Sequence, residues 1–236
     1  RTKNICKELN RNVKLIALVP NSKGVQRAVK AGIDTINYVI SVSEEHNKRN
    51  VKRTVDESFN NLKTILKDYQ NINIRLALAC TFGSPFGDPI DLDNVKEISE
   101  KALEMGIEKI GYGDSAGLCT PNKMRNTLKE IKKYVDIDDI SLHLHDTRGM
   151  GIANSYVAIE EGIYQFDSSL GGLGGCPFIP GAAGNISTED LANMLTEMKV
   201  ETNIYLNKLV ETSIFMKNKV KSNYNSRIQQ MNIVKI

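Results

Sequence analysis

Residues Ser141–Gly149 read Ser-Leu-His-Leu-His-Asp-Thr-Arg-Gly, and this stretch decides the fold. Its first residues are typical of a β-strand, and the polar residues that follow predict that the strand ends in a loop. His143 and His145 are two of the three histidines in the chain. Because residues i and i+2 of a strand point to the same face, both imidazoles can reach one metal ion. The stretch therefore predicts a strand whose carboxyl end carries a metal site.

Similar apolar, β-branched runs recur along the chain, with longer amphipathic segments between them. The expected strands are Lys14–Val19, Thr35–Ser41, Ile74–Cys80, Lys109–Gly113, Ser141–His145 and Gln165–Leu170. The expected helices are Gly24–Ala31, Val51–Tyr69, Asp93–Met105, Pro121–Tyr134, Gly151–Glu161 and Thr188–Lys199. Strands that alternate with helices predict an α/β fold with a parallel sheet and right-handed crossovers.

Two features favour a closed TIM (β/α)8 barrel over an open doubly wound sheet. No Gly-x-Gly-x-x-Gly motif follows the first strand, and polar or small residues stand at the strand ends, where barrel loops build the active site. The chain offers fewer strands than closure needs, so we expect roughly the first two βα units to lie upstream of Arg1. In this interpretation residues 1–200 are an N-terminally truncated barrel domain. Residues 201–236 are a C-terminal helix, expected at Tyr205–Val220, and a polar tail packing on the barrel.

The composition indicates an ordinary globular protein. The 236 residues are 41% hydrophobic, enough for a large core. No apolar run approaches the roughly 20 residues that cross a bilayer, and the start has no secretion signal, so we expect no membrane association. Four separated cysteines without a Cys-x-x-Cys pair predict a reducing, cytoplasmic setting. A net charge of +3 is too small to indicate nucleic acid binding.

A glycine-rich stretch downstream of the histidines carries a carboxamide and a thiol. Asn185 precedes a helix and in isolation would be a cap or turn residue, but beside the histidine strand its oxygen suits a hard cation. Cys176 is either a buried structural thiol or, on a flexible loop at a barrel mouth, a group delivered to the reaction centre. We predict that Asn185 is a metal ligand with His143 and His145, and that Cys176 is catalytic. Oxygen ligands favour Mg or Mn over Zn or Fe.

Two other strand ends carry polar groups. Asp114 stands among small residues and is interpreted either as a cap of the next loop or as a group that supports the site or contacts substrate. The charged stretch 41–50 contains Glu44, His46 and Lys48. We expect this stretch to be a loop, whose charges are either simply solvated or place Lys48 against phosphates.

These motifs together resemble the 3-hydroxy-3-methylglutaryl-CoA lyases of the DRE-TIM metallolyase superfamily. The segments HLHDTRGMGIAN and SSLGGLGGCPFIPGAAGNISTEDL carry the resemblance, and LVPNSKG, the SxSEEHNKRNV loop and YGDSAGLCTP fall in the expected order over nearly the whole chain. Claisen-type synthases of the superfamily typically carry a GxGERxGN-like stretch where this chain has Cys176 and no Glu-Arg pair. The resemblance therefore favours carbon–carbon cleavage over condensation.

The resemblance implies a reaction and roles for the site residues. His143, His145 and Asn185 would be three ligands of a divalent cation, Mg or Mn. The family's fourth ligand, an Asp in an Arg-Asp-Gly motif at the end of the first strand, has no counterpart in this sequence. The implied reaction is cleavage of 3-hydroxy-3-methylglutaryl-CoA to acetyl-CoA and acetoacetate, a step that suits leucine degradation. His143 would act as base, and Cys176 would protonate the enolate or exclude water from it.

The remaining expectations concern the substrate and its partners. Asp114 is included with the catalytic candidates, and Asn21 and Lys48 are the predicted binding residues for an acyl-CoA substrate. The family also implies a homodimer. Arg148 stands where better-known lyases often have Tyr, which leaves open a related substrate such as citramalyl-CoA. The sequence also leaves open a Claisen-type synthase and a non-catalytic barrel fragment.

Overall fold

A curved parallel sheet forms the centre of the molecule. The computed structural model describes residues 13–175, 184–220, 224 and 226–231. Within these residues each strand pairs in parallel with the next one along the chain. The strands are β1 (Ile16–Val19), β2 (Thr35–Ser41), β3 (Asn73–Ala79), β4 (Ile110–Asp114), β5 (Ile140–Leu144) and β6 (Phe166–Asp167). Each strand begins within two residues of its predicted first residue.

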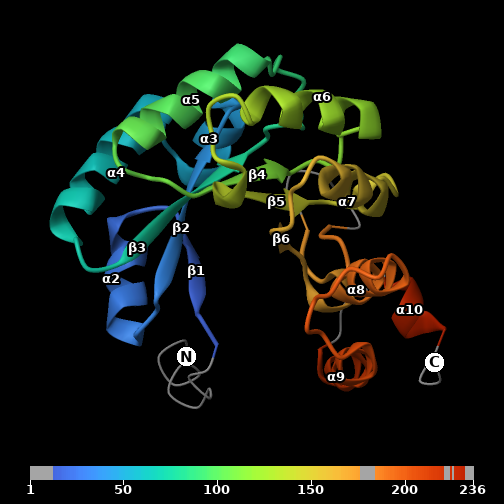
Figure 1. Ribbon diagram of the computed structural model, residues 1–236. Coiled ribbons are helices and arrows are strands. Elements are labelled where there is room, and N and C mark those ends of the chain that lie inside the picture. The colour runs from blue at the N-terminus through green and yellow to red at the C-terminus, as the bar shows by residue number, and fades with distance from the viewer. Residues whose placement is uncertain (1–12, 176–183, 221–223, 225, 232–236) are drawn as a thin grey trace.

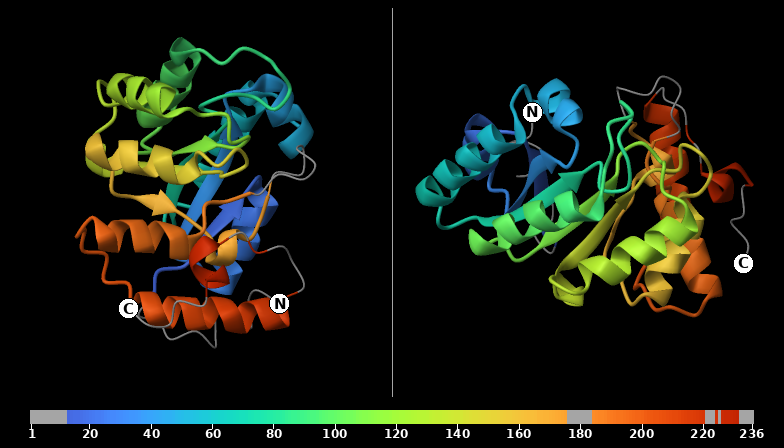
Figure 2. Two further views of the ribbon diagram at one scale, coloured as in Figure 1. Left: turned by 90° about the vertical axis from the view of Figure 1, so that its right-hand side faces the viewer. Right: turned by 90° about the horizontal axis from the view of Figure 1, so that it is seen from above.

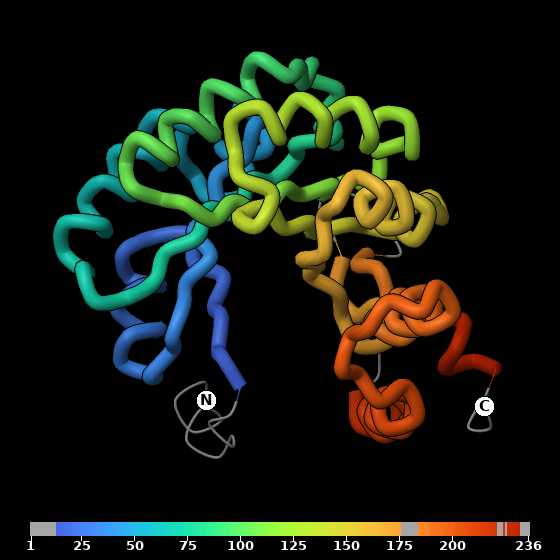
Figure 3. Tube along the Cα trace, in the orientation of Figure 1, coloured from blue at the N-terminus to red at the C-terminus, as the bar shows by residue number. Residues whose placement is uncertain are grey.

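Helices cover the convex side of this sheet (Figure 1). They are α2 (Ser22–Ala31), α3 (Glu44–Val51), α4 (Val55–Asp68), α5 (Leu92–Glu104), α6 (Pro121–Ile131), α7 (Gly151–Glu160) and α8 (Thr188–Glu197), with short 3₁₀ turns η1 (Ile137–Asp139) and η2 (Leu170–Gly172). The tube in Figure 3 and the turned views in Figure 2 show the chain following an arc, with β1 and β6 at its two ends. In the described part of the chain β1 and β6 do not pair with each other. The arrangement is that of a TIM barrel represented by six strands, which confirms the predicted fold class.

The core lies between the sheet and its helices. On β2, Ile36, Tyr38 and Ile40 are each 0% exposed and point toward the helix layer, where Leu62 and Ile65 of α4 are equally buried. The Tyr38 hydroxyl donates to the Ser58 carbonyl oxygen (3.0 Å), so this buried phenol is satisfied. Alternate residues of the strands therefore pack against the helices, and the intervening residues face the concave side of the sheet.

The segment after β2 differs from the expectation of a loop followed by one long helix. Residues Glu44–Val51 form α3, which begins where the Ser43 hydroxyl accepts a hydrogen bond from the His46 N–H (3.0 Å). Lys52 then adopts a left-handed conformation (φ 59°) that ends α3, and Thr54 starts α4. The predicted loop over 41–50 is wrong because a serine cap and two glutamates in the first turn are a helix start signal.

The C-terminal part packs beside α8. Helix α9 (Leu206–Lys219) and the short helix α10 (Arg227–Gln230) both contact α8, as the lower right of Figure 1 shows. The predicted polar tail from Lys221 thus contains a helical turn, which begins at the Ser226 cap. None of the helices in the described ranges is both long and apolar enough to cross a membrane.

Candidate active site

A cavity of about 220 Å³ lies on the concave face of the sheet. Its wall is formed mainly by every second residue of the strands, as the two-residue period of a strand leads one to expect. The strand residues that line it are Leu18, Asn37, Val39, Ala77, Leu78, Ala79, Gly111, Gly113, His143 and Asp167. His145 and Ser115, just beyond their strands, also line the wall, so the cavity reaches the carboxyl end of the sheet.

Small residues create the space for this cavity. Ala77 pairs with Gly111 across β3 and β4, and Gly113 pairs with His143 across β4 and β5. In a closed barrel such positions usually carry bulky side chains that fill the interior. Here a row of alanine and glycine leaves room in front of the two histidines.

His143 and His145 project to the same side of β5, as the sequence predicts. Their ring centroids are 5.3 Å apart. The His143 Nδ1 atom lies 3.6 Å from Oδ2 of Asp167, its neighbour on β6. His145 is only 7% exposed, and burial together with the nearby His143 lowers the pKa of His145 to about 4. His145 is therefore a neutral imidazole at physiological pH, the state in which a histidine binds a metal ion.

Asn185 lies directly beside His145. The two residues form an isolated antiparallel bridge, and the flanking backbone is fixed by hydrogen bonds from Asp146 N–H to the Gly184 carbonyl (2.8 Å) and from Ile186 N–H to the Leu144 carbonyl (3.1 Å). The Asn185 amide nitrogen donates to the Leu173 carbonyl (2.8 Å). This hydrogen bond orients the amide toward the His145 imidazole, and this contact partly opposes the lowering of the His145 pKa.

The residues brought together here fit a divalent cation. Asn185 Oδ1 and His145 Nδ1 are buried and have no hydrogen-bond partner among the described residues. Buried polar atoms in native proteins are nearly always paired, so two orphans side by side indicate an absent ligand. Two imidazoles and one carboxamide leave part of the coordination shell open. In the described ranges no three His, Cys, Asp or Glu side chains form a group that could hold a metal.

Asp114 does not line the cavity. Its carboxylate is 0% exposed and accepts hydrogen bonds from the N–H groups of Leu118 (2.9 Å) and Cys119 (3.1 Å). Burial raises the pKa of Asp114, although these two N–H groups oppose the effect. The geometry matches a cap that holds the loop between β4 and α6, and it gives no support to direct contact with substrate.

The predicted substrate-binding residues lie at the carboxyl ends of β1 and β2. Asn21 caps α2 by accepting from the Gly24 N–H (2.9 Å). Lys48 lies on α3, half exposed, with its ammonium 3.3 Å from Glu44. Neither side chain lines the cavity, so their binding roles stay predictions. Cys176 lies outside the described residues, and its catalytic role also stays a prediction.

Two cavity residues were not singled out from the sequence. Asp167 is the residue beside His143, and Asn37 presents a buried Oδ1 atom without a hydrogen-bond partner in the described part of the chain. Both follow the two-residue period of their strands. The signal that could have found them is a polar side chain within a short, otherwise apolar strand segment.

Comparison with known proteins supplies independent information about the family of this chain. Residues 1–216 match the family model described as HMGL-like. The chain is 37% identical over 212 residues to hydroxymethylglutaryl-CoA lyase YngG of Bacillus subtilis, covering 89% of this chain and 71% of that protein. It is 36% identical over 215 residues to the mitochondrial hydroxymethylglutaryl-CoA lyase of Homo sapiens, covering 90% of this chain and 66% of that protein.

Solved structures show the same architecture. The HMG-CoA lyase of Bacillus subtilis superposes with a TM-score of 0.92 at 35% identity, covering 97% of this chain and 78% of that chain. An HMG-CoA lyase from Acinetobacter baumannii, solved in complex with coenzyme A and 3-methylmalate, gives a TM-score of 0.93 at 33% identity and covers 98% of this chain and 76% of that chain.

Proposed function

Because this chain belongs to the HMGL-like family, we propose that it is a divalent-cation-dependent lyase that cleaves 3-hydroxy-3-methylglutaryl-CoA to acetyl-CoA and acetoacetate. The observation that carries the proposal is that His143 and His145 lie side by side in the cavity wall and that Asn185 forms a bridge with His145. The structure of the Acinetobacter baumannii relative with coenzyme A supports an acyl-CoA substrate.

His143, His145 and Asn185 would hold the cation. A divalent cation at this position supplies Lewis-acid polarisation and orientation of the substrate's hydroxyl and carboxylate oxygens. The Asn185–Leu173 hydrogen bond fixes the amide so that its oxygen faces the imidazole of His145. The lowered pKa of His145 keeps this side chain unprotonated and able to donate its lone pair.

His143 and Asp167 would move the proton of the C3 hydroxyl. A neutral imidazole has a single lone pair, so in our proposal His143 accepts the proton only while that lone pair is not bound to the cation. The Nδ1 atom lies 3.6 Å from the Asp167 carboxylate, which would stabilise the positive charge that protonation of the ring creates. Loss of the hydroxyl proton lets the C2–C3 bond break, which releases the ketone and leaves an acetyl-CoA enolate. Cys176 is the predicted proton donor to this enolate.

The experiment is an assay of acetyl-CoA release from 3-hydroxy-3-methylglutaryl-CoA with Mg²⁺ or Mn²⁺. We expect release that stops with a chelator and returns when the cation is restored. Asp167→Asn should lower kcat by about 10-fold or more, since outer partners of ligating histidines typically contribute that much. Asp139→Asn, which breaks an ion pair to Lys109 (3.3 Å) away from the cavity, is the control. Absence of release from the wild-type protein in the presence of bound Mn²⁺ would favour a non-catalytic barrel fragment.

A related substrate is the second candidate, and Arg148 is the reason. Arg148 is exposed and donates to the Gly117 carbonyl (3.4 Å), so its charge stands at the edge of the loop after β5. Citramalyl-CoA cleavage would release pyruvate with acetyl-CoA. Assaying both thioesters for acetyl-CoA and for the two keto acids decides between the substrates.

The remaining parts of the proposal are a cytoplasmic location, a homodimer and a place in leucine degradation. Among the relatives, the rat protein is named cytoplasmic and several vertebrate ones mitochondrial. Fractionation of the host cell and light scattering of the purified protein test the first two, and growth on leucine after gene deletion tests the third.

A further inference from the structure

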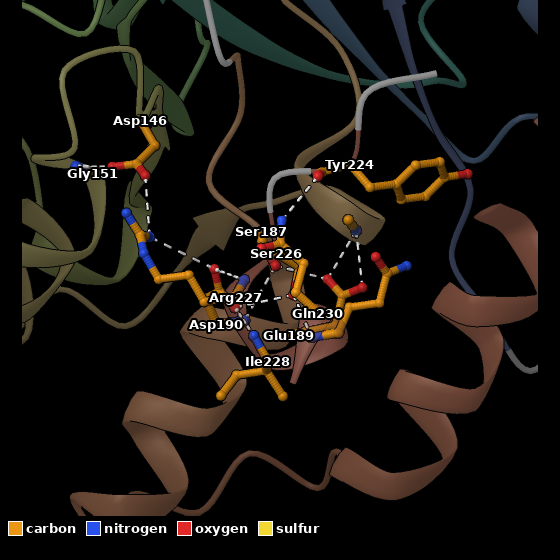
Figure 4. Close-up of polar contacts among 12 residues, drawn as sticks. Asp146, Gly151, Ser187, Glu189, Asp190, Tyr224, Ser226, Arg227, Ile228 and Gln230 are labelled. Carbon is orange, nitrogen blue, oxygen red and sulfur yellow. Dashed lines mark hydrogen bonds and ion pairs between the residues drawn. The ribbon is translucent and has the colours of Figure 1, made fainter. Parts of the chain in front are cut away.

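The C-terminal residues Tyr224 and 226–231 are attached to the barrel by polar contacts. We refer to them as the C-terminal clamp. Asp190 of α8 accepts hydrogen bonds from the Ser226 hydroxyl (3.0 Å), the Arg227 N–H (3.1 Å) and the Ile228 N–H (3.0 Å) (Figure 4). This carboxylate therefore caps the first turn of α10 and fixes its position on α8. The clamp lies beyond residues 1–216, the part that the family model matches.

The clamp contacts the loop that follows the metal-ligand strand. The Arg227 guanidinium lies 3.6 Å from Oδ2 of Asp146, which directly follows His145. The other carboxylate oxygen of Asp146 accepts from the Gly151 N–H (2.8 Å) at the start of α7, and its backbone N–H donates to the Gly184 carbonyl next to Asn185. Asp146 thus links the two predicted ligands to each other and to α7.

The clamp also covers the base of the glycine-rich stretch. The ring of Tyr224, 7% exposed, packs on Gly171 so closely that a Cβ there would lie 2.1 Å from its Cδ1 atom. On the other side, the buried Glu189 carboxylate accepts from the Gly171 N–H (2.8 and 3.0 Å). Gly171 is therefore held between Tyr224 and Glu189, two residues before Leu173, whose carbonyl orients Asn185.

We propose that Arg227 is a positioning residue for the metal site, acting through Asp146. This inference rests on the proposed function for its catalytic consequence. Arg227 is 65% exposed, so its ion pair by itself adds little stability. Its effect is geometric: the backbone of Arg227 is anchored on Asp190, and the guanidinium, 3.9 Å from Asp190 Oδ2 and 3.6 Å from Asp146 Oδ2, holds the Asp146 carboxylate toward α10 and with it the His145–Asn185 bridge.

The test compares Arg227→Gln with Arg227→Lys and with Lys133→Gln. Lys133 is a matched control, because it is also 65% exposed and pairs with a carboxylate, Glu130, at 2.6 Å, away from the site. We expect Arg227→Gln to weaken Mn²⁺ binding about 10-fold and to speed hydrogen exchange at least about 3-fold in peptides covering residues 144–152. Other peptides should exchange as in the wild type. Arg227→Lys should recover most of both losses, and kcat should follow Mn²⁺ affinity while KM for the thioester stays unchanged.

Two results would overturn the proposal. One is that Arg227→Gln matches Lys133→Gln in Mn²⁺ affinity and exchange, and the other is that exchange rises uniformly along the chain, as a general loss of stability would produce. Mn²⁺ affinity and exchange are measured without substrate. They therefore test the clamp even if the wild-type protein cleaves none of the thioesters, which would count against the proposed function alone.

Discussion

At the scale of single residues, the candidate site depends on how each polar side chain divides its hydrogen bonds. Asn185 uses its nitrogen on the Leu173 carbonyl and keeps its oxygen for a ligand. Asp114 uses both oxygens on backbone N–H groups and keeps none. The same comparison separates the predicted ligand Asn185 from the loop cap Asp114.

Replacing Asn185 tests this division. Asn185→Ala removes the oxygen donor, so we expect Mn²⁺ affinity to fall by at least about 10-fold. Asn185→Asp keeps an oxygen donor and should bind Mn²⁺ more tightly than Asn185→Ala, although it loses the hydrogen bond to Leu173. Isothermal titration with Mn²⁺ measures both, and the Mn²⁺-induced rise in melting temperature gives a second readout. Equal affinity for wild type and Asn185→Ala would remove Asn185 from the ligand set.

Gly171 offers a test of packing at one position. It has a φ of +64°, which disfavours side chains, and Tyr224 occupies the space of a Cβ. Gly106 has a φ of +83° with no atom within 4 Å of the point that a Cβ would occupy, so Gly106→Ala isolates the backbone cost, about 1 kcal/mol. We expect Gly171→Ala to lose about 1–3 kcal/mol more, because Tyr224 must move. Urea unfolding of the two variants measures the difference in the free energy of unfolding. Equal losses would mean that the Tyr224 ring moves aside without measurable cost.

At the scale of elements, start and stop signals decide how the segment between β2 and β3 is divided. A Thr-x-x-Glu capping box at Thr54 and Glu57 begins α4, with the Thr54 N–H bound to Glu57 (2.8 Å) and the Glu57 N–H bound to Thr54 (3.0 Å). The left-handed Lys52 separates α4 from α3. The amphipathic periodicity of the sequence continues across this boundary, so periodicity alone does not reveal where α4 begins.

The capping box predicts that replacing two threonines of the same segment changes the stability of the protein differently. Thr54→Ala removes the cap and should destabilise the protein by about 1 kcal/mol. Thr64, an exposed interior position of α4, bonds only the Asn60 carbonyl of its own helix (3.1 Å). Thr64→Ala should be neutral or stabilising, because alanine is the better helix former. Chemical unfolding of both variants distinguishes the two positions, and a loss at Thr64 as large as at Thr54 would contradict the assignment of the helix start.

Strand positions were predictable because each strand is a short apolar run bounded by polar residues, and the family resemblance is confirmed by the comparisons. The side-by-side placement of His143 and His145 follows directly from the strand period. By contrast, the pairing of Arg227 with Asp146 and the packing of Tyr224 on Gly171 join residues with no local pattern in common. Such long-range contacts are set by tertiary packing, so the sequence pattern did not reveal them.

At the scale of the whole molecule, adjacent βα units are joined by contacts on the outer layer. Glu161, after α7, pairs with Lys132 (2.7 Å) and Arg125 (3.0 Å) of the preceding unit. The Glu161 side chain is 10% exposed, and the Lys132 hydrogen bond is the main reason that the pKa of Glu161 is lowered. This network therefore couples the stability of the barrel to pH.

The sign of that coupling is fixed by the lowered pKa. As the pH falls, the unfolded chain takes up the Glu161 proton before the folded protein does, so stabilisation by Glu161 is complete above its ordinary pKa near 4.5 and is lost at lower pH. We expect Glu161→Gln to be less stable than wild type by a constant amount between about pH 6 and pH 8, with a difference that shrinks below about pH 4.5. Thermal unfolding across this range measures it. A difference that grows on acidification would mean that Glu161 is not stabilised as an anion.

The sequential order of the strands has a consequence for biosynthesis. Since each strand pairs with the next, the sheet can assemble in the order in which the ribosome delivers it. The bridge between His145 and Asn185 cannot close until the chain has passed α7 and β6, and the contact of Arg227 with Asp146 forms later still. A chain released early from the ribosome would therefore have a folded sheet and an unassembled centre, a product that could pass a test of compactness while lacking the proposed cation site.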